Sequence, residues 1–274
     1  MSGVILRLKN LYQNRLARFI YEKTEKPIIR SVDWCGRHVG LTVIILLLIG
    51  MGLRVGYRGM VDRPERDELT YLAMIETSVL EDHVTPDAQR TLIFVGTSVT
   101  KLGGDPEFWL RCFNLSCSLL WLFMIFFLGK TTTSSSLVGL CCLCLATFNP
   151  YSIRLSGQVM REPLYLLIFT YSLFCAIEIV RGKRLFLYSA LLGPLTILGV
   201  WSREEGMELS VLMPLALLFY GINLKRAQKT RQWPRLLSAF LLYAFSLGSS
   251  MMILCCAYQQ KIEFIKYRIM NIFN

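Results

Sequence analysis

Charged residues and histidines are scarce in this sequence. Charged residues make up 18% of the 274, hydrophobic residues make up 54%, and the mean hydropathy is +0.46. This balance lies outside the usual range of water-soluble domains and argues against a soluble enzyme. The chain has two histidines, and Cys141, Cys142 and Cys144 lie inside an apolar run where they act as small hydrophobes. The sequence therefore predicts neither a zinc site nor a disulfide framework.

The basic residues are in excess but are not gathered on one polar face. Thirty lysines and arginines stand against nineteen acidic residues, which gives a net charge of +11. A nucleic-acid-binding protein concentrates such charge on one surface, whereas here it falls in short islands between apolar runs. We therefore expect no nucleic-acid partner and interpret the charge as a sign of membrane topology.

Long apolar segments predict an all-α, polytopic membrane helix bundle. A helix needs about 20 apolar residues to cross a hydrocarbon core of about 30 Å, because its backbone groups must pair within the segment. About seven segments meet this description, although the third and fifth are short enough to need neighbouring helices. They are residues 39–57, 108–129, 135–149, 163–180, 185–201, 207–224 and 236–258.

The lysines and arginines beside these segments predict the orientation. With the N-terminus in the cytoplasm, 17 of the 30 basic residues fall on the cytoplasmic side. Residues 1–38 are then a basic, amphipathic cytoplasmic lead, and residues 39–274 form a single transmembrane domain. Residues 58–107 become a long external loop that contains ten of the nineteen acidic residues. In this loop one apolar stripe predicts a helix that lies along the membrane surface; its residues are Leu69, Leu72, Ala73, Val79 and Leu80. Residues 91–102 are predicted to be interfacial or partly re-entrant and packed against protein.

The acidic pair Asp67-Glu68 in this loop is the first candidate for chemistry. Tyr71 follows one helical turn later, and Arg66 precedes the pair. Carboxylates at an apolar boundary gain proton affinity by desolvation and can then act as a general base, while Arg66 opposes that shift. The same acids could also bind a divalent cation, although oxygen ligands alone do not establish one. The structural alternative is that both acids stabilise a helix N-terminus.

Glu162 and several arginines complete the candidate set. Glu162 lies between Arg161 and a proline at the predicted start of a span, where ordinary helix capping is the alternative role. Arg111 and Arg203 lie near the external ends of two spans, and arginine binds phosphate oxygens through its planar fork. The alternative for each arginine is that it reaches out to the lipid headgroups, which we expect of Arg54.

Four short motifs follow one another along the chain. They are Arg66-Asp67-Glu68-Leu69-Thr70-Tyr71, the stretch from Gly104 to Arg111, Asn149-Pro150 with Ser156-Gly157 and Arg161-Glu162-Pro163-Leu164-Tyr165, and Ser202-Arg203-Glu204-Glu205-Gly206. Taken in this order over residues 40–210, they resemble the GT-C membrane glycosyltransferases, in particular the bacterial branch related to protein O-mannosyltransferases and to the lipid A aminoarabinose transferase. Members of that superfamily usually have more spans, so the chain is expected to be short at its C-terminus.

The resemblance implies an enzyme that moves a sugar from a polyprenyl-phosphate donor to an acceptor on the non-cytoplasmic face. Asp67 and Glu68 match the acidic pair of the first external loop, and one of them would be the catalytic base. Glu162 matches a second-loop acid, and it stands where some relatives have aspartate. Arg111 and Arg203 match basic positions that suit the donor phosphate. Single displacement with inversion is the expected mechanism.

These roles define the expected site and its partners. Asp67, Glu68 and Glu162 are the predicted catalytic residues, and the predicted substrate-binding residues are Arg66, Tyr71, Arg111, Arg161 and Arg203. We expect a polyprenyl-phosphate sugar donor, membrane lipids and an unidentified acceptor as partners, in a bacterial inner membrane. The alternative function is a non-catalytic membrane subunit or a transporter-like bundle, including a truncated transferase homologue, which keeps the architecture without the reaction.

Overall fold

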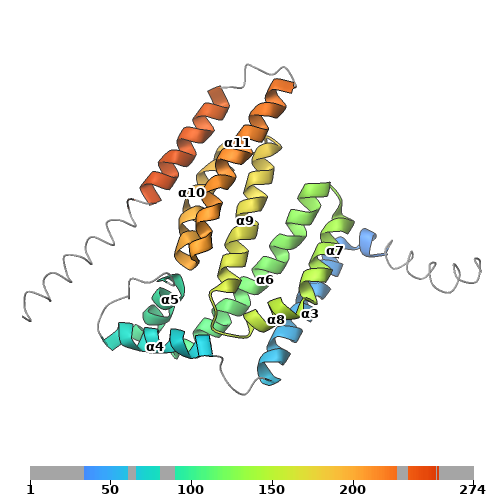
Figure 1. Cartoon of the computed structure of the whole chain (residues 1–274). Helices are drawn as coiled ribbons and strands as arrows, with labels where there is room; N and C mark the ends of the chain where they lie inside the picture. Colours follow the sequence, from blue (N-terminus) through green and yellow to red (C-terminus); the bar gives the residue numbers. More distant parts are fainter. Residues whose placement is uncertain (1–33, 61–65, 81–89, 227–233, 251, 253–274) are drawn as a thin grey trace, which may run out of the picture.

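The computed structural model describes residues 34–60, 66–80, 90–226, 234–250 and 252, and these residues form helices and connecting turns without a strand (Figure 1). Residues 234–250 are the last long helical stretch in this part of the chain. The elements before it are α3 (Val39–Met60), α4 (Arg66–Leu80), α5 (Arg90–Lys101), α6 (Pro106–Thr133), α7 (Ser136–Thr147), α8 (Pro150–Ser156), α9 (Glu162–Val180), α10 (Leu185–Ser202), the 3-10 helix η2 (Glu204–Glu208) and α11 (Leu209–Arg226).

Among the described residues, five helical segments are long and apolar enough to cross a membrane, which makes the chain a multi-pass membrane protein. They are α3, α6, α9, α10 and residues 205–223. The third predicted span, 135–149, is instead the 12-residue α7, which is bent by 64° relative to α8; the pair gives a sixth crossing if both helices form one span. The seventh predicted span, 236–258, extends beyond the described residues. The prediction of seven spans is therefore not confirmed, and five or six are found.

Asparagine, aspartate and proline residues fix where two helices begin. Asp105 is the N-cap of α6, and its carboxylate accepts hydrogen bonds from the backbone N–H groups of Glu107 and Phe108. Asn149 caps α8 in the same way, and a proline follows each cap. These caps set the helical register, and so they set the direction in which Arg111 and Ser152 point.

The helices α6 and α9 run parallel to each other. Near their N-terminal ends, Asn114 donates from Nδ2 to the carbonyl oxygens of Gln158 and Met160, over 2.7 and 2.8 Å. Beyond their C-terminal ends, Nη2 of Arg181 donates to Oγ of Ser134 over 3.1 Å. Because two consecutive long helices run in the same direction, α7 and α8 between them return the chain along the bundle (Figure 1).

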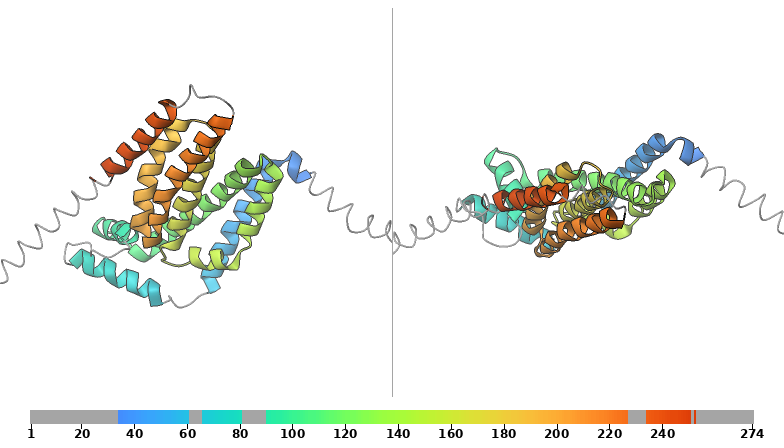
Figure 2. Two further views of the ribbon diagram at one scale, coloured as in Figure 1. Left: turned by 45° about the horizontal axis from the view of Figure 1, so that its top comes forward. Right: turned by 90° about the horizontal axis from the view of Figure 1, so that it is seen from above.

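The helices α4 and α5 lie across one end of the bundle, as both views show (Figures 1 and 2). We call this the α4 end. It also holds the C-terminal ends of α3 and α10, the N-terminal ends of α6 and α9, and α8. Tyr71, Ile75, Leu92, Ile93 and Leu110 pack together there, so α5 is packed against protein as predicted. The candidate residues all belong to elements that meet at this end.

Candidate functional site

One face of α4 is turned into the protein. Glu68, Tyr71, Ile75 and Ser78 are buried at helical spacing, with exposed fractions of 0, 5, 1 and 1%. The predicted apolar stripe that begins at Leu69 lies on a different side of the helix, because Leu69 is half exposed. The inward face of α4 therefore contains a carboxylate and a phenol, which is an unusual choice for a core-facing position.

Arg111 of α6 neutralises the buried Glu68. Its Nε and Nη2 groups both donate to Oε1 of Glu68, over 3.0 and 2.7 Å. Glu107, one turn earlier on α6, pairs with the same guanidinium, and Arg58 of α3 lies 3.6 Å from the carboxylate of Glu107. Oε2 of Glu68 is buried and accepts no hydrogen bond from the residues that the structure describes. Three helices are thus joined by one chain of alternating charges, which we call the Glu68 cluster (Arg58, Glu68, Glu107 and Arg111).

Arg203 organises a second group of charges at the same end. It donates from Nε and Nη2 to the two carboxylate oxygens of Glu205, over 2.8 and 2.9 Å, and its Nη1 lies 3.5 Å from Oε1 of Glu162. The hydrogen bond to Glu205 is the main cause that raises the pKa of Arg203. Nε of Arg161 is 4.0 Å from Oε1 of Glu162. We call this group the Arg203 cluster (Arg161, Glu162, Arg203 and Glu205).

Glu162 does not cap its own helix. Arg161 is the N-cap residue of α9, and no side chain makes a cap hydrogen bond there. The carboxylate of Glu162 instead forms ion pairs, and its Oε2 atom is buried without a hydrogen-bond partner. The structural alternative considered for Glu162, capping by its side chain, is therefore wrong.

Tyr71 lies within electrostatic range of the Arg203 cluster. It lies one turn after Glu68 on the inward face of α4, and burial is the main cause that raises the pKa of its phenol. The charges of Arg161 and Arg203 lower this pKa, while those of Glu162 and Asp67 raise it. Residues from α4, the start of α9 and the end of α10 therefore act on one hydroxyl group, although they are up to about 130 positions apart in sequence.

The predicted site residues on α4 differ in burial. Asp67 is exposed at the first turn of α4, while the adjacent Glu68 is fully buried, so the acidic pair points in two directions. Arg66 begins α4, but its side chain lies outside the described part of the structure. Within the described residues, no group of three or more His, Cys, Asp or Glu side chains could hold a metal ion. A cation held by Asp67 and Glu68 would have to find its other ligands elsewhere.

Buried polar residues beneath the site were not singled out from the sequence. Asn114 and Gln158 are fully buried, and Asn114 holds the turn at 158–160 that leads into Arg161 and Glu162. In the described part of the chain, no group donates to Oδ1 of Asn114 or to Oε1 of Gln158, and none accepts from Nε2 of Gln158. The signal that could have found Asn114 is an amide inside an otherwise apolar span, which usually faces protein and not lipid.

Arg54 does not reach out to the headgroups, as we expected, but is completely buried. Its Nε donates to Ser118, its Nη2 to Ser152 and its Nη1 to the carbonyl of Gly50, over 2.8, 3.2 and 3.1 Å. The prediction failed because position 54 faces α6 and α8, and hydroxyl groups on these two helices satisfy the guanidinium. The sequence alone does not show which face of α3 is covered.

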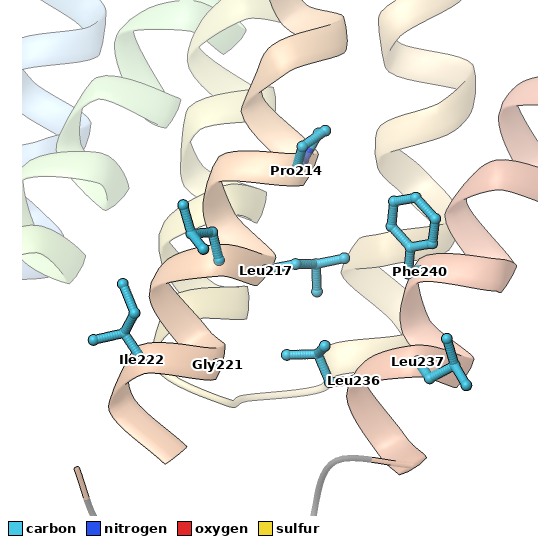
Figure 3. Close-up of a pocket in the computed structure, with 8 residues that line it drawn as sticks. Pro214, Leu217, Gly221, Ile222, Leu236, Leu237 and Phe240 are labelled. Atoms are coloured by element: carbon cyan, nitrogen blue, oxygen red, sulfur yellow. The ribbon is translucent and has the colours of Figure 1, made fainter. Parts of the chain in front are cut away.

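Two apolar cavities lie away from these charges, between α11 and the helix at 234–250. The first has a volume of 480 Å³ and is drawn in Figure 3, where Leu217 of α11 and Phe240 of the facing helix point into the gap. The second has a volume of 680 Å³ and is lined by Tyr243 and Leu247, among others. Of the described residues that line these two cavities, none is charged, so the candidate chemistry remains at the α4 end.

Comparison with known proteins gives no further guide to this arrangement. Protein-family models, curated proteins and solved structures were compared with the chain, and none of them matches it.

Proposed function

We propose that the chain is a membrane glycosyltransferase that moves a sugar from a polyprenyl-phosphate donor to a lipid, glycan or protein acceptor. The observation that carries this proposal is the meeting of Asp67, Glu162, Arg161 and Arg203 around the buried phenol of Tyr71. Acids and guanidinium groups from separate connections at one end of a bundle can serve an acceptor hydroxyl and a phosphate leaving group together. The four motifs of the GT-C resemblance supply most of these residues.

The reaction would be a single displacement. The acceptor hydroxyl oxygen forms a bond to C1 of the sugar, its proton passes to a carboxylate, and the bond from C1 to the carrier phosphate breaks with its electron pair on the phosphate oxygen. Asp67 is our choice for the base because it is exposed, whereas Glu68 is buried under Arg111. Glu68 is then a positioning residue that fixes Arg111. Tyr71 remains protonated at neutral pH and can donate a hydrogen bond.

The membrane setting follows the same proposal. With the basic connections after α6 and α9 in the cytoplasm, the α4 end faces the opposite side, where a polyprenyl-phosphate donor presents its sugar. Arg181 and Lys183 lie at the far end of the bundle from α4, which supports this orientation. We propose the inner membrane of a bacterium as the location.

One observation favours a second function, a non-catalytic membrane subunit or transporter-like bundle. Glu68 and Glu162 are both held in ion pairs within the protein, and Arg203 donates hydrogen bonds from Nε and Nη2 to the carboxylate of Glu205. Charges that satisfy one another can simply fasten α4 to the bundle. In that case the same residues would stabilise the fold and take no part in any transfer.

Sugar transfer by the purified protein in liposomes tests the two readings against each other. The donors are polyprenyl-phosphate sugars, and the products are glycolipids and glycopeptides identified by mass spectrometry. Asp67→Asn should lower kcat about 100-fold or more, since general base catalysis contributes about 10²–10⁴-fold. Glu76→Gln, an exposed acid on the same helix, is the matched control and should keep the wild-type rate. Equal rates in both variants would remove Asp67 as the base and favour the second function.

A further inference from the structure

A cavity of 360 Å³ opens at the α4 end between α3, α6 and α8. Three arginines line it, namely Arg54, Arg58 and Arg111, and the apolar side chains of Val55, Phe108 and Leu115 cover much of the rest. Arg58 and Arg111 also belong to the Glu68 cluster, whereas Arg54 does not. We call this space the arginine cavity.

Arg54 contributes an uncompensated positive charge to the inner wall of this cavity. Its side chain has no exposed surface, and its three hydrogen-bond acceptors are two hydroxyl groups and one carbonyl group, all of them neutral. Neutral oxygens satisfy N–H groups but do not cancel a charge. A guanidinium that is buried without a counter-ion is unfavourable, and an anion nearby would relieve it. Among the described residues, no carboxylate forms an ion pair with Arg54.

Arg58 and Arg111 present groups that an anion could touch. Their side chains are 27% and 20% exposed, so both reach the open part of the cavity, while Arg54 acts from behind through its field. Glu107 and Glu68 already pair with these two arginines. The positive charge that the described carboxylates leave uncompensated is therefore that of Arg54. Arginine forks are suited to phosphate oxygens.

The depth of the cavity favours a lipid over a soluble ion. Arg54 lies six residues before the end of α3 and Arg111 five residues after the start of α6, which places both roughly 8–9 Å inside the helix ends. Val55 and Phe108 beside them are 51% and 58% exposed on helices that are apolar enough to cross a membrane. A headgroup that entered here would keep its hydrocarbon chain on an apolar surface.

We infer that the arginine cavity binds the phosphate monoester headgroup of a membrane lipid. The phosphate would contact Arg58 and Arg111 at the mouth and would compensate the charge of Arg54 behind them. The inference does not rest on the proposed transferase, because it needs only a phosphate lipid and no sugar transfer. Polyprenyl phosphate and phosphatidic acid share this headgroup chemistry.

Lipid binding to the full-length protein in phosphatidylcholine nanodiscs tests the inference. The probes are phosphatidic acid, polyprenyl phosphate, the phosphodiester lipid phosphatidylglycerol and free inorganic phosphate, and the readout is lipid retained per protein by native mass spectrometry. We expect retention of one or both monoester lipids above phosphatidylglycerol, and the one retained more tightly identifies the tail. Binding of inorganic phosphate without retention of either monoester lipid would overturn the inference. Retention of phosphatidylglycerol equal to that of the monoester lipids would also overturn it.

The variants separate charge from folding. Arg58→Gln and Arg54→Gln should each weaken monoester binding about tenfold, the effect of one lost charge-assisted contact. Arg54→Lys keeps the charge behind the cavity and should bind within a few-fold of the wild type, so loss in Arg54→Gln alone is an electrostatic effect. Arg154→Gln, an exposed arginine on α8 outside the cavity lining, is the control and should bind normally. If Arg154→Gln weakens binding as much as Arg58→Gln, the attraction comes from diffuse surface charge and the inference is wrong.

Failure of this inference and failure of the proposed function give different results. Asp67→Asn should keep full lipid binding, since Asp67 does not line the cavity. If Asp67→Asn abolishes transfer while Arg58→Gln leaves binding unchanged, the transferase stands and the arginine cavity is rejected. If binding depends on the arginines while transfer is absent, the site stands and the transferase is rejected.

Discussion

Removal of Arg111 should destabilise the protein far more than removal of its partner Glu68. Arg111→Gln leaves the carboxylate of Glu68 with no exposed surface and no cation, and breaking a buried ion pair in this way costs about 3–5 kcal/mol. Glu68→Gln leaves Arg111 20% exposed and still paired with Glu107, so the cost should be about 1–2 kcal/mol. The two partners of one ion pair thus differ because only one is completely buried.

The double variant Glu68→Gln/Arg111→Gln sharpens this prediction. It removes both charges, so it should recover part of the stability that Arg111→Gln loses. Thermal unfolding in detergent is the measurement, and a loss of 3–5 kcal/mol corresponds to a fall in Tm of roughly 6–20 °C in a chain of this size. Glu76→Gln, at an exposed acid on α4, is the control. A double variant that is no more stable than Arg111→Gln, or a Tm for Arg111→Gln equal to the wild type, would refute the reasoning.

Three further predictions concern packing, titration and capping. Gly206→Ala should be strongly destabilising, because an added Cβ would collide with the backbone of Gly199. Gly52→Ala, on an open face of α3, should leave the Tm unchanged or raise it slightly. Thermal unfolding of both variants measures the difference. The phenol of Tyr71 has its pKa raised above the ordinary 10.0, so its contribution to stability is complete below pH 10 and is lost as the pH rises above 10. Tyr71→Phe should therefore lose less stability than the wild type between pH 9 and pH 11, and equal alkaline losses would contradict this. Asp105→Ala should cost about 1 kcal/mol by removing the N-cap of α6, and Asp105→Asn should restore most of it in the same unfolding assay.

The sequence predicted the helical elements well because their signals are local. An apolar run of some 20 residues fixes α3, α6, α9 and α10 to within a few residues. The span at 135–149 was predicted as one helix, although Asn149-Pro150 interrupts it and starts α8 at a steep angle. Hydropathy counts apolar residues and does not register a bend, so the number of crossings could not be obtained in this way.

The candidate site could be predicted only in part because burial is a tertiary property. Adjacent positions 67 and 68 have identical local signals, yet one carboxylate is exposed and the other is enclosed by α6. Arg54 and Arg111 both lie near the ends of apolar helices, and nothing local distinguishes a guanidinium that faces lipid from one that faces Ser118 and Ser152. The sequence identified the charged residues of the candidate site, but their hydrogen-bond and ion-pair partners could be read only from the fold.

The short α7 has a consequence for the membrane around the protein. It rises only roughly 18 Å over its 12 residues, while the adjacent 28-residue α6 rises roughly 42 Å. Because α6 and α9 run in the same direction, α7 and α8 must return the chain across the same layer. Because α7 alone is shorter than a hydrocarbon core of about 30 Å, we expect the bilayer to be thinner on that flank. The protein should therefore prefer membranes of short-chain lipids, with its thinnest lipid contact beside α7.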